Sequence, residues 1–593
     1  MRKMKWLFFS YVAFVVLLIL FIGISFSASP ARDNHTVYVP YGGALSTLDP
    51  GKLNDTVGAM IVGPVYECLY NYKYAHQPYE LFPEVAADMP QTSDDGLTMT
   101  IKLRHGIHFY DPEKKVFPQG EGPEIKAKDV IYSFKRVCDF NLGSANYSQV
   151  FEDKIVGLPE WWDYTKNTSK ENIDWDRPVE GFKILDDYTI QLKLTAPDPQ
   201  MIFNLAHEPT SVVCRQAVDY WKEKFGTHPV GSGPYMVVQI LPQQQIVMEA
   251  NPVYRGRPDV DGGVAVSADE RLPHITRIQY QYFDEPLPEW MLFEQGMLDT
   301  AGIPKEKFNS AISATGDLTP EMTRRGVVLK KVVESETEYI GFNMQDPIVG
   351  KNKPLRQAMS LAFDRETFIR NFLNGRGTPC IGPIPPGFPT FDDKRVNPYT
   401  QLNLALARQK MVEAEKINGG PIPPLSLLMR DTDTTSRQMA EFFAGQMREI
   451  GLTVTPEFRD FARWIERVDN RQTQIFDAGW EADYPDEQNF FQLFYGKNAP
   501  AGGVNSTAYV NPAFDALYDK AAILNDSPER RALYRQMEDI VMDDCCWLSE
   551  IYPIVYSLRY DWMSTMEPMN YGHGNISHWK LDAALRDQRL KKF

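Results

Sequence analysis

Segments typical of β-strands and segments typical of α-helices alternate irregularly along this chain, and this feature constrains its fold most. The stretches HTVYVPYG and TMTIKLRHGIHF alternate apolar and polar residues, as half-buried strands do. The stretch AKDVIYSFKRVCDF instead repeats apolar residues at the spacing of an amphipathic helix. This mixture predicts α/β domains rather than an all-α or an all-β body.

The chain of 593 residues is too long for one hydrophobic core, so we expect three or four domains. Its composition, with 43% hydrophobic and 24% charged residues, is that of a globular protein without low-complexity runs. The formal net charge is −16, and no basic cluster of useful size precedes the last few residues. Nucleic-acid binding needs a basic face, so we expect no nucleic-acid partner.

The cysteines and histidines do not follow the spacing of a zinc site. We therefore expect no metal and no cofactor. The adjacent pair Cys545–Cys546 is interpreted as two buried small apolar residues rather than a disulfide.

The first 31 residues predict export. Arg2, Lys3 and Lys5 precede about 21 largely apolar residues, and the small residues SASPA follow, with cleavage expected after Ser27 or Ala31. The apolar run is also long enough to span a bilayer, so residues 1–31 are either a signal peptide or a membrane anchor. We expect a periplasmic protein, free or tethered to the inner membrane. The leader has no cysteine, which excludes lipid attachment there. Removal of the leader would take away three positive charges from the formal net charge of −16 and leave a net charge of −19.

Three internal segments carry more local predictions. The stretch KILDDYTIQLKLTAP predicts a hairpin with Asp186 and Asp187 at its turn, and residues 157–180 predict an ordered loop. The stretch PLRQAMSLAFDRETFIRNFL predicts one amphipathic helix with a charged outer face. Gly231 and Gly233 in GSGPY predict a turn that brings two backbones close together, without any ligand.

Five segments together resemble the family 5 extracellular solute-binding proteins, the dipeptide- and oligopeptide-binding proteins of bacterial ABC importers. The resemblance extends from about His35 to about Trp579. Its segments, in chain order, are LSTLDP; MTIKLRHGIHF with IKAKDVIYSFKRV; VGSGPYMV with NPVYRGRP; PLRQAMSLAFDRETFIRNFLNGRGTPCIGPIPPG; and IFDAGWEADYPDEQNFFQLF.

The resemblance implies an α/β fold of the class II periplasmic binding protein type. It has three lobes built from discontinuous chain, with a hinge and a ligand cleft between domains I and III. Carried over to this chain, domain I would hold residues 33–56, 196–336 and 555–593, domain II residues 57–195, and domain III residues 337–554.

The segment GWEADYPD is the candidate binding site, because it places polar groups on a loop directly after a predicted buried strand. By resemblance, Asp483 would accept the α-ammonium group of a peptide, and Trp480 would form an aromatic wall. The candidate ligand-binding residues are Gly479, Trp480, Glu481, Ala482, Asp483 and Tyr484. Two alternatives remain open: Asp483 serves only to turn the loop, and Trp480 only packs in the core.

This chain also departs from the family pattern. Ala44 and Leu45 stand where many relatives carry a polar or acidic residue facing the ligand. Asp477 stands where some peptide binders have a basic residue for the ligand carboxylate. The insertions at 111–124, 157–180 and 256–273 would cap the cleft or cover the surface.

The resemblance implies a monomer that captures peptides or similar small ligands by lobe closure and delivers them to ABC permease subunits at the inner membrane, without chemistry on the ligand. One alternative is a membrane-tethered signalling or chaperone-like adaptor with the same fold. The other is a hydrolase, which the sequence disfavours. It contains neither G-x-S-x-G nor HExxH, and Ser232 in GSGPY is better explained by the turn.

Overall fold

A computed structural model describes residues 32–592, apart from positions 44, 54, 77, 145, 257–259, 262–263, 266–271, 568 and 572. The leader at 1–31, Ala44 and much of the insertion at 256–273 therefore lie outside the described residues. Within the described part of the chain, no helix is long and apolar enough to cross a membrane.

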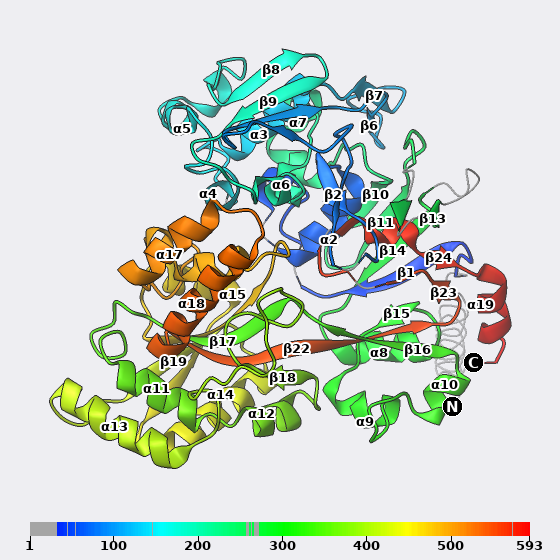
Figure 1. Ribbon diagram of the computed structural model, residues 1–593. Helices are drawn as coiled ribbons and strands as arrows, with labels where there is room; N and C mark the ends of the chain where they lie inside the picture. The colour runs from blue at the N-terminus through cyan, green and yellow to red at the C-terminus, as the bar shows by residue number, and fades with distance from the viewer. Residues whose placement is uncertain are drawn as a thin grey trace, which may run out of the picture.

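Three sheets organise the molecule, and helices pack around each of them (Figure 1). The first sheet has four strands, in the order β1 (Thr36–Tyr41), β14 (Arg277–Tyr282), β11 (Gln245–Ala250) and β10 (Tyr235–Leu241). The second also has four, in the order β4 (Gln91–Thr92), β5 (Thr98–Lys102), β9 (Thr189–Lys193) and β8 (Phe182–Asp186). The third has eight strands: β15 (Thr300–Ala301), β22 (Trp547–Tyr560), β17 (Glu336–Phe342), β21 (Ile475–Glu481), β19 (Leu425–Met429) and β20 (Val454–Phe458), with β16 (Val327–Val333) and β18 (Gly377–Pro379) also paired to β22.

Shorter elements complete the described fold. Four two-stranded sheets pair β2 (Tyr70–Tyr72) with β3 (Leu81–Pro83), β6 (His108–Tyr110) with β7 (Glu121–Glu124), β12 (Val260–Asp261) with β13 (Val264–Ala265), and β23 (Met563–Ser564) with β24 (Lys580–Leu581). The helices are α2 (Thr56–Val65), α3 (Ala127–Val137), α4 (Tyr147–Val150), α5 (Leu158–Lys166), α6 (Met201–Asn204), α7 (Arg215–Trp221), α8 (Pro286–Glu294), α9 (Phe308–Ala311), α10 (Pro320–Arg324), α11 (Lys353–Ala362), α12 (Arg365–Phe372), α13 (Leu404–Asn418), α14 (Thr434–Arg448), α15 (Phe461–Asp469), α16 (Gln488–Phe491), α17 (Pro512–Ala522), α18 (Pro528–Asp544) and α19 (Ala583–Leu590).

The long strand β22 joins two parts of the third sheet. Its first half pairs antiparallel with β17, and its second half pairs antiparallel with β16. In Figure 1, β22 crosses the middle of the molecule with β17 beside one half and β16 beside the other. Between β16 and β17 the chain has only Glu334 and Ser335, and the Glu334 amide donates to the carbonyl of Pro553 at 3.1 Å. Two adjacent chain crossings therefore connect the two parts of this sheet.

Three local predictions are confirmed. Strands β8 and β9 form the expected hairpin, with Asp186 and Asp187 at its turn. A Cβ atom on Gly231 would lie 2.0 Å from the Val65 carbonyl oxygen, so this turn and the end of α2 meet at a distance that only glycine allows. All six cysteines are free and buried, as expected for the pair at 545–546.

Two local predictions are wrong. The stretch from Pro354 to Phe372 forms two helices rather than one, because Asp364 caps the start of α12 by accepting from the Thr367 amide at 3.0 Å. Its arginines do not all face solvent: Arg356 and Arg365 are buried and donate to backbone carbonyls. The segment 157–180 is not only a loop, because it contains helix α5.

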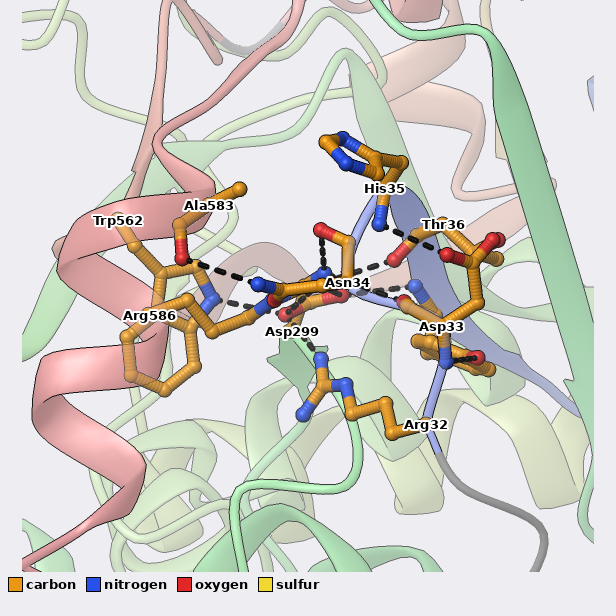
Figure 2. Close-up of polar contacts among 10 residues, drawn as sticks. Arg32, Asp33, Asn34, His35, Thr36, Asp299, Trp562, Ala583 and Arg586 are labelled. Atoms are coloured by element: carbon orange, nitrogen blue, oxygen red, sulfur yellow. Dashed lines mark hydrogen bonds and ion pairs between the residues drawn. The ribbon is translucent and has the colours of Figure 1, made fainter.

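A buried charged cluster ties the two ends of the described chain together (Figure 2). Asp299 is fully buried, and its carboxylate accepts from the Tyr38 amide at 2.8 Å and from Trp562 Nε1 at 2.7 Å. It also forms ion pairs with Arg32 and with Arg586, the latter at 3.3 Å. Arg586, on α19, donates further to the Thr36 carbonyl at 2.9 Å. Several donors thus compensate one buried carboxylate and hold α19 against β1.

Candidate functional site

A cavity of about 400 Å³ opens beside the C-terminal end of β21. We call it the ammonium cavity. Its walls come from the start of α2, the turn at 207–209, the end of β21 with the two residues that follow it, and the residue pair 570–571. Its lining residues are Leu53, Asp55, Thr56, Ala59, Asn146, His207, Glu208, Pro209, Gly479, Trp480, Glu481, Ala482, Asp483, Asn570 and Tyr571. Segments far apart in the sequence therefore meet here.

Five of the six candidate binding residues line this cavity, namely Gly479 through Asp483. Tyr484 does not belong to the lining. Its ring is buried and stacks on Phe203, with 5.6 Å between ring centroids, and its hydroxyl donates to Gln488 at 3.2 Å. The side chain of Tyr484 therefore anchors the loop from behind.

The Asp483 carboxylate is about a quarter exposed and is held in position by Asn489. Asn489 is fully buried; its Nδ2 donates to Asp483 Oδ2 at 3.0 Å, and its Oδ1 accepts from the Asp483 amide at 3.2 Å. The same Oδ1 accepts from Trp480 Nε1 at 2.8 Å. One buried amide thus orients both side chains that the sequence singled out, which favours a preorganised site.

The loop after Asp483 is fixed to the helices beneath it. Asp486 accepts from both terminal nitrogens of the buried Arg530, at 2.5 and 3.0 Å, and from the Tyr534 hydroxyl at 3.0 Å. Glu487 accepts from the Thr390 amide at 2.7 Å. The two acidic residues that follow the Tyr-Pro pair therefore hold the loop, whereas Asp483 faces the cavity.

The ammonium cavity is acidic. Four lining residues carry carboxylates, Asp55, Glu208, Glu481 and Asp483, and none of its described lining residues is Lys or Arg. His207 is the one lining residue that can carry a positive charge; its Nε2 lies 3.9 Å from Asp483 Oδ1 and 3.9 Å from Glu208 Oε2. A partly desolvated group of carboxylates attracts a cation more strongly than the same groups would in water.

Sequence reasoning missed the opposite wall of this cavity. Asp55 caps α2 by accepting from the Gly58 amide at 2.6 Å, so its position before a helix gave a capping signal but no sign of a site. Glu208 begins a short 3-10 helix, Glu208–Thr210, and His207 directly precedes it, but this stretch contains no motif. Only the fold places them opposite Asp483.

Asp477, the predicted departure from the family pattern, lies outside the ammonium cavity. It lies on β21 and pairs with Arg430, with 3.4 Å between Nε and Oδ2. Leu45 is not among the described lining residues either. No group of three or more His, Cys, Asp or Glu suited to holding a metal ion occurs among the described residues.

Comparison with known proteins places this architecture in a defined class. The periplasmic binding protein DppA from Helicobacter pylori, solved in complex with the peptide STSA, superposes with a TM-score of 0.74 and 21% identity over 92% of this chain and 98% of that chain. The fold is therefore that of the periplasmic peptide-binding proteins, a mixed α/β architecture, as predicted.

The family model of bacterial extracellular solute-binding proteins, family 5 (middle), matches residues 80–502, and the chain belongs to this family. The oligopeptide-binding protein OppA of Bacillus subtilis (strain 168) is 22% identical over 505 residues, which cover 84% of each chain. Heme-binding protein A of Haemophilus influenzae is 25% identical over 509 residues, covering 84% of this chain and 82% of that protein. Relatives with similar coverage are thus named for different ligands.

Proposed function

We propose that this protein captures peptides, or similar small ligands with a free ammonium group, in the ammonium cavity. One observation carries this proposal: the cavity is lined by four carboxylates and by no described Lys or Arg, and Asp483 is held by a fully buried asparagine. A ligand ammonium group at Asp483 would form a charge-assisted hydrogen bond in a partly desolvated site. The Trp480 ring would lie beside it.

We also propose that closure of two lobes traps the ligand. The switch of partners along β22, from β17 to β16, supports a division near residues 336–337 and 554–555, the predicted limits of domains I and III. The second sheet, within residues 57–195, supports a separate domain II. The hinge would then consist of the segment at Glu334–Ser335 and the middle of β22. Hinge closure around a ligand is a common motion in periplasmic binding proteins.

The remaining parts of the proposal follow from the family. The protein would act as a periplasmic monomer and hand its ligand, chemically unchanged, to the permease of an ABC importer. Incubation with a peptide pool followed by mass spectrometry tests the last point, since cleaved peptides would indicate a hydrolase. Uptake of a labelled peptide by cells with and without the protein separates an importer component from an adaptor.

Asp483→Ala is the direct test of ammonium binding. The first step is native mass spectrometry of the purified protein, to identify a retained ligand. Calorimetry should then show that Asp483→Ala weakens binding of a free-amine peptide by about 10- to 100-fold, because a charge-assisted hydrogen bond contributes about 1.5–3 kcal/mol.

The matched control is Asp176→Ala, which removes an exposed carboxylate whose side chain is 89% accessible. An N-acetylated version of the same peptide should bind the unmutated protein weakly and should lose little further affinity in Asp483→Ala. Equal binding of both peptides by the unmutated and the Asp483→Ala proteins would show that the ammonium assignment is wrong.

A further inference from the structure

A second cavity, of about 270 Å³, lies against the part of the third sheet that β17, β19, β21 and the first half of β22 form. We call it the inner cavity. Helices α12 and α14 close its other side with apolar side chains, among them Phe368, Met439 and Phe443. Five of its lining residues carry carboxyl groups, and only one, Arg430, carries a positive charge.

Glu550 is the buried carboxyl group of the inner cavity. It lies on β22, its residue is 6% exposed, and its side chain lines the cavity. None of the described residues donates a hydrogen bond to its carboxylate, whereas its backbone carbonyl accepts from the Cys380 amide at 3.2 Å. Burial, followed by the charges of Asp477 and Glu338, raises the pKa of Glu550 well above its usual range. Buried polar groups normally have partners, so Glu550 is an exception that needs an explanation.

Arg430 does not supply the missing partner, because two other carboxylates already engage it. Its Nη2 donates to both Glu338 oxygens at 2.8 Å, and its Nε lies 3.4 Å from Asp477 Oδ2. Burial alone would lower the pKa of Arg430, but Asp477 and Glu338 outweigh burial and raise it. Burial also raises the pKa of Asp477 to about 6. The inner cavity therefore holds an excess of carboxylate over cation even with Arg430 in place.

The inner cavity adjoins the ammonium cavity across β21. Gly479 lines the ammonium cavity, and a Cβ atom on it would lie 2.5 Å from Glu338 Oε2 and 3.0 Å from Arg430 Nη1, which line the inner cavity. The two linings therefore come into close contact at Gly479.

We propose that the inner cavity is a second subsite, which accepts an organic cation on a short apolar stem, with Glu550 as its acceptor. An ammonium or guanidinium group would satisfy the unpartnered carboxylate, and the stem would lie against the apolar side chains of α12 and α14. A metal ion fits less well, because the described His, Cys, Asp and Glu side chains form no group suited to metal ligation. The cation is either a basic side chain of a bound peptide or a free amine. The first possibility rests on the proposed function, and the second does not.

The test uses the full protein and probes of matched length whose side chain is either cationic or uncharged. Tetra-alanine is prepared with lysine, or with its uncharged analogue norleucine, at each position in turn, and 1,5-diaminopentane serves as the free amine. Calorimetry should show that lysine binds at least about tenfold more tightly than norleucine at one position, and that Glu550→Gln reduces this ratio to about threefold or less. The diamine should bind the unmutated protein and not Glu550→Gln if a free amine is the ligand.

Two controls keep the outcomes distinct. Glu538→Gln removes a carboxyl group that is equally buried, at 6% exposure, but is paired with Arg395 outside the inner cavity, so it should leave the lysine-to-norleucine ratio unchanged. Asp483→Ala should weaken both peptides together and also preserve the ratio.

If no tetrapeptide binds, the proposed function is wrong for peptides. Binding of the diamine then decides by itself whether the inner cavity is a cation subsite. If neither the lysine ratio nor diamine binding differs between the unmutated protein and Glu550→Gln, the second subsite is overturned. Tight binding of Ca²⁺ that Glu550→Gln abolishes would overturn its assignment to an organic cation.

Discussion

Asp299 and Glu550 are both buried carboxyl groups, but their surroundings differ. Asp299 receives hydrogen bonds or ion pairs from Tyr38, Trp562, Arg32 and Arg586 (Figure 2). Glu550 receives none from the described residues and faces a cavity with further carboxylates. A buried carboxyl group with several donors holds segments together, whereas a buried carboxyl group that faces an open space is the basis of the proposed second subsite.

The largest expected effect comes from breaking the compensated cluster. Asp299→Ala should lower the free energy of unfolding by about 3–5 kcal/mol, because it leaves Arg586 buried without its carboxylate. Urea unfolding measures this loss. Lys170→Ala breaks the exposed pair with Glu223 and should cost no more than about 1 kcal/mol. Similar losses in both variants would contradict the structural role of Asp299.

A smaller loss is expected when the inner cavity loses Arg430, the one cation among its described lining residues. Arg430→Gln should lower the free energy of unfolding by about 1.5–3 kcal/mol at pH 8, since Glu338 and Asp477 then lose their charged donor. The loss should shrink at pH 5, because burial raises the pKa of Asp477 to about 6 and this group then takes up a proton. Parallel urea titrations at both pH values measure the difference, and a loss that grows at pH 5 would show that the guanidinium acts mainly by packing.

The smallest effect has the opposite sign. Glu550→Gln should stabilise the unliganded protein at pH 8, because it removes a carboxyl group whose ionisation burial opposes. A raised pKa means that the folded state binds a proton more tightly than the unfolded state does. The stability contribution of Glu550 is therefore present at low pH and is lost as the pH rises above its unfolded value.

Measurements of unfolding at two pH values check this sign. The gain from Glu550→Gln should be larger at pH 8 than at pH 5, because burial raises the pKa of Glu550 and its unfolded form ionises at the higher pH. Asp486→Asn is the contrast, because it neutralises the carboxylate that pairs with the buried Arg530 and should destabilise the protein at pH 8. If Glu550→Gln instead destabilises the protein at pH 8, Glu550 has a structural role like that of Asp299.

Much of the fold could be predicted from local patterns. The hairpin β8–β9, helix α3 and strand β21 each follow from apolar spacing over a few residues. The GSGPY turn was also predictable, because two glycines beside a proline indicate a close backbone approach. The prediction of a single helix over residues 354–373 was wrong, because a capping aspartate at 364 outweighs a continuous apolar spacing.

The candidate site was predictable only on one side. The segment Gly479–Asp483 could be found because it follows a strongly patterned strand and resembles a family motif. Asp55, His207 and Glu208 could not, because each comes from a different part of the chain and none belongs to a recognisable pattern. The only sign of the inner cavity in the sequence was Asp477, an acidic residue at a position where some relatives have a basic one.

The sequence by itself therefore determined the α/β class, the family and the loop that carries Asp483, since these depend on short-range spacing and on motifs. Only the tertiary structure decided which carboxyl groups are compensated and which face open space. That distinction depends on donors from distant segments: Arg586 reaches Asp299 across 287 residues of chain, whereas no described segment brings a donor to Glu550.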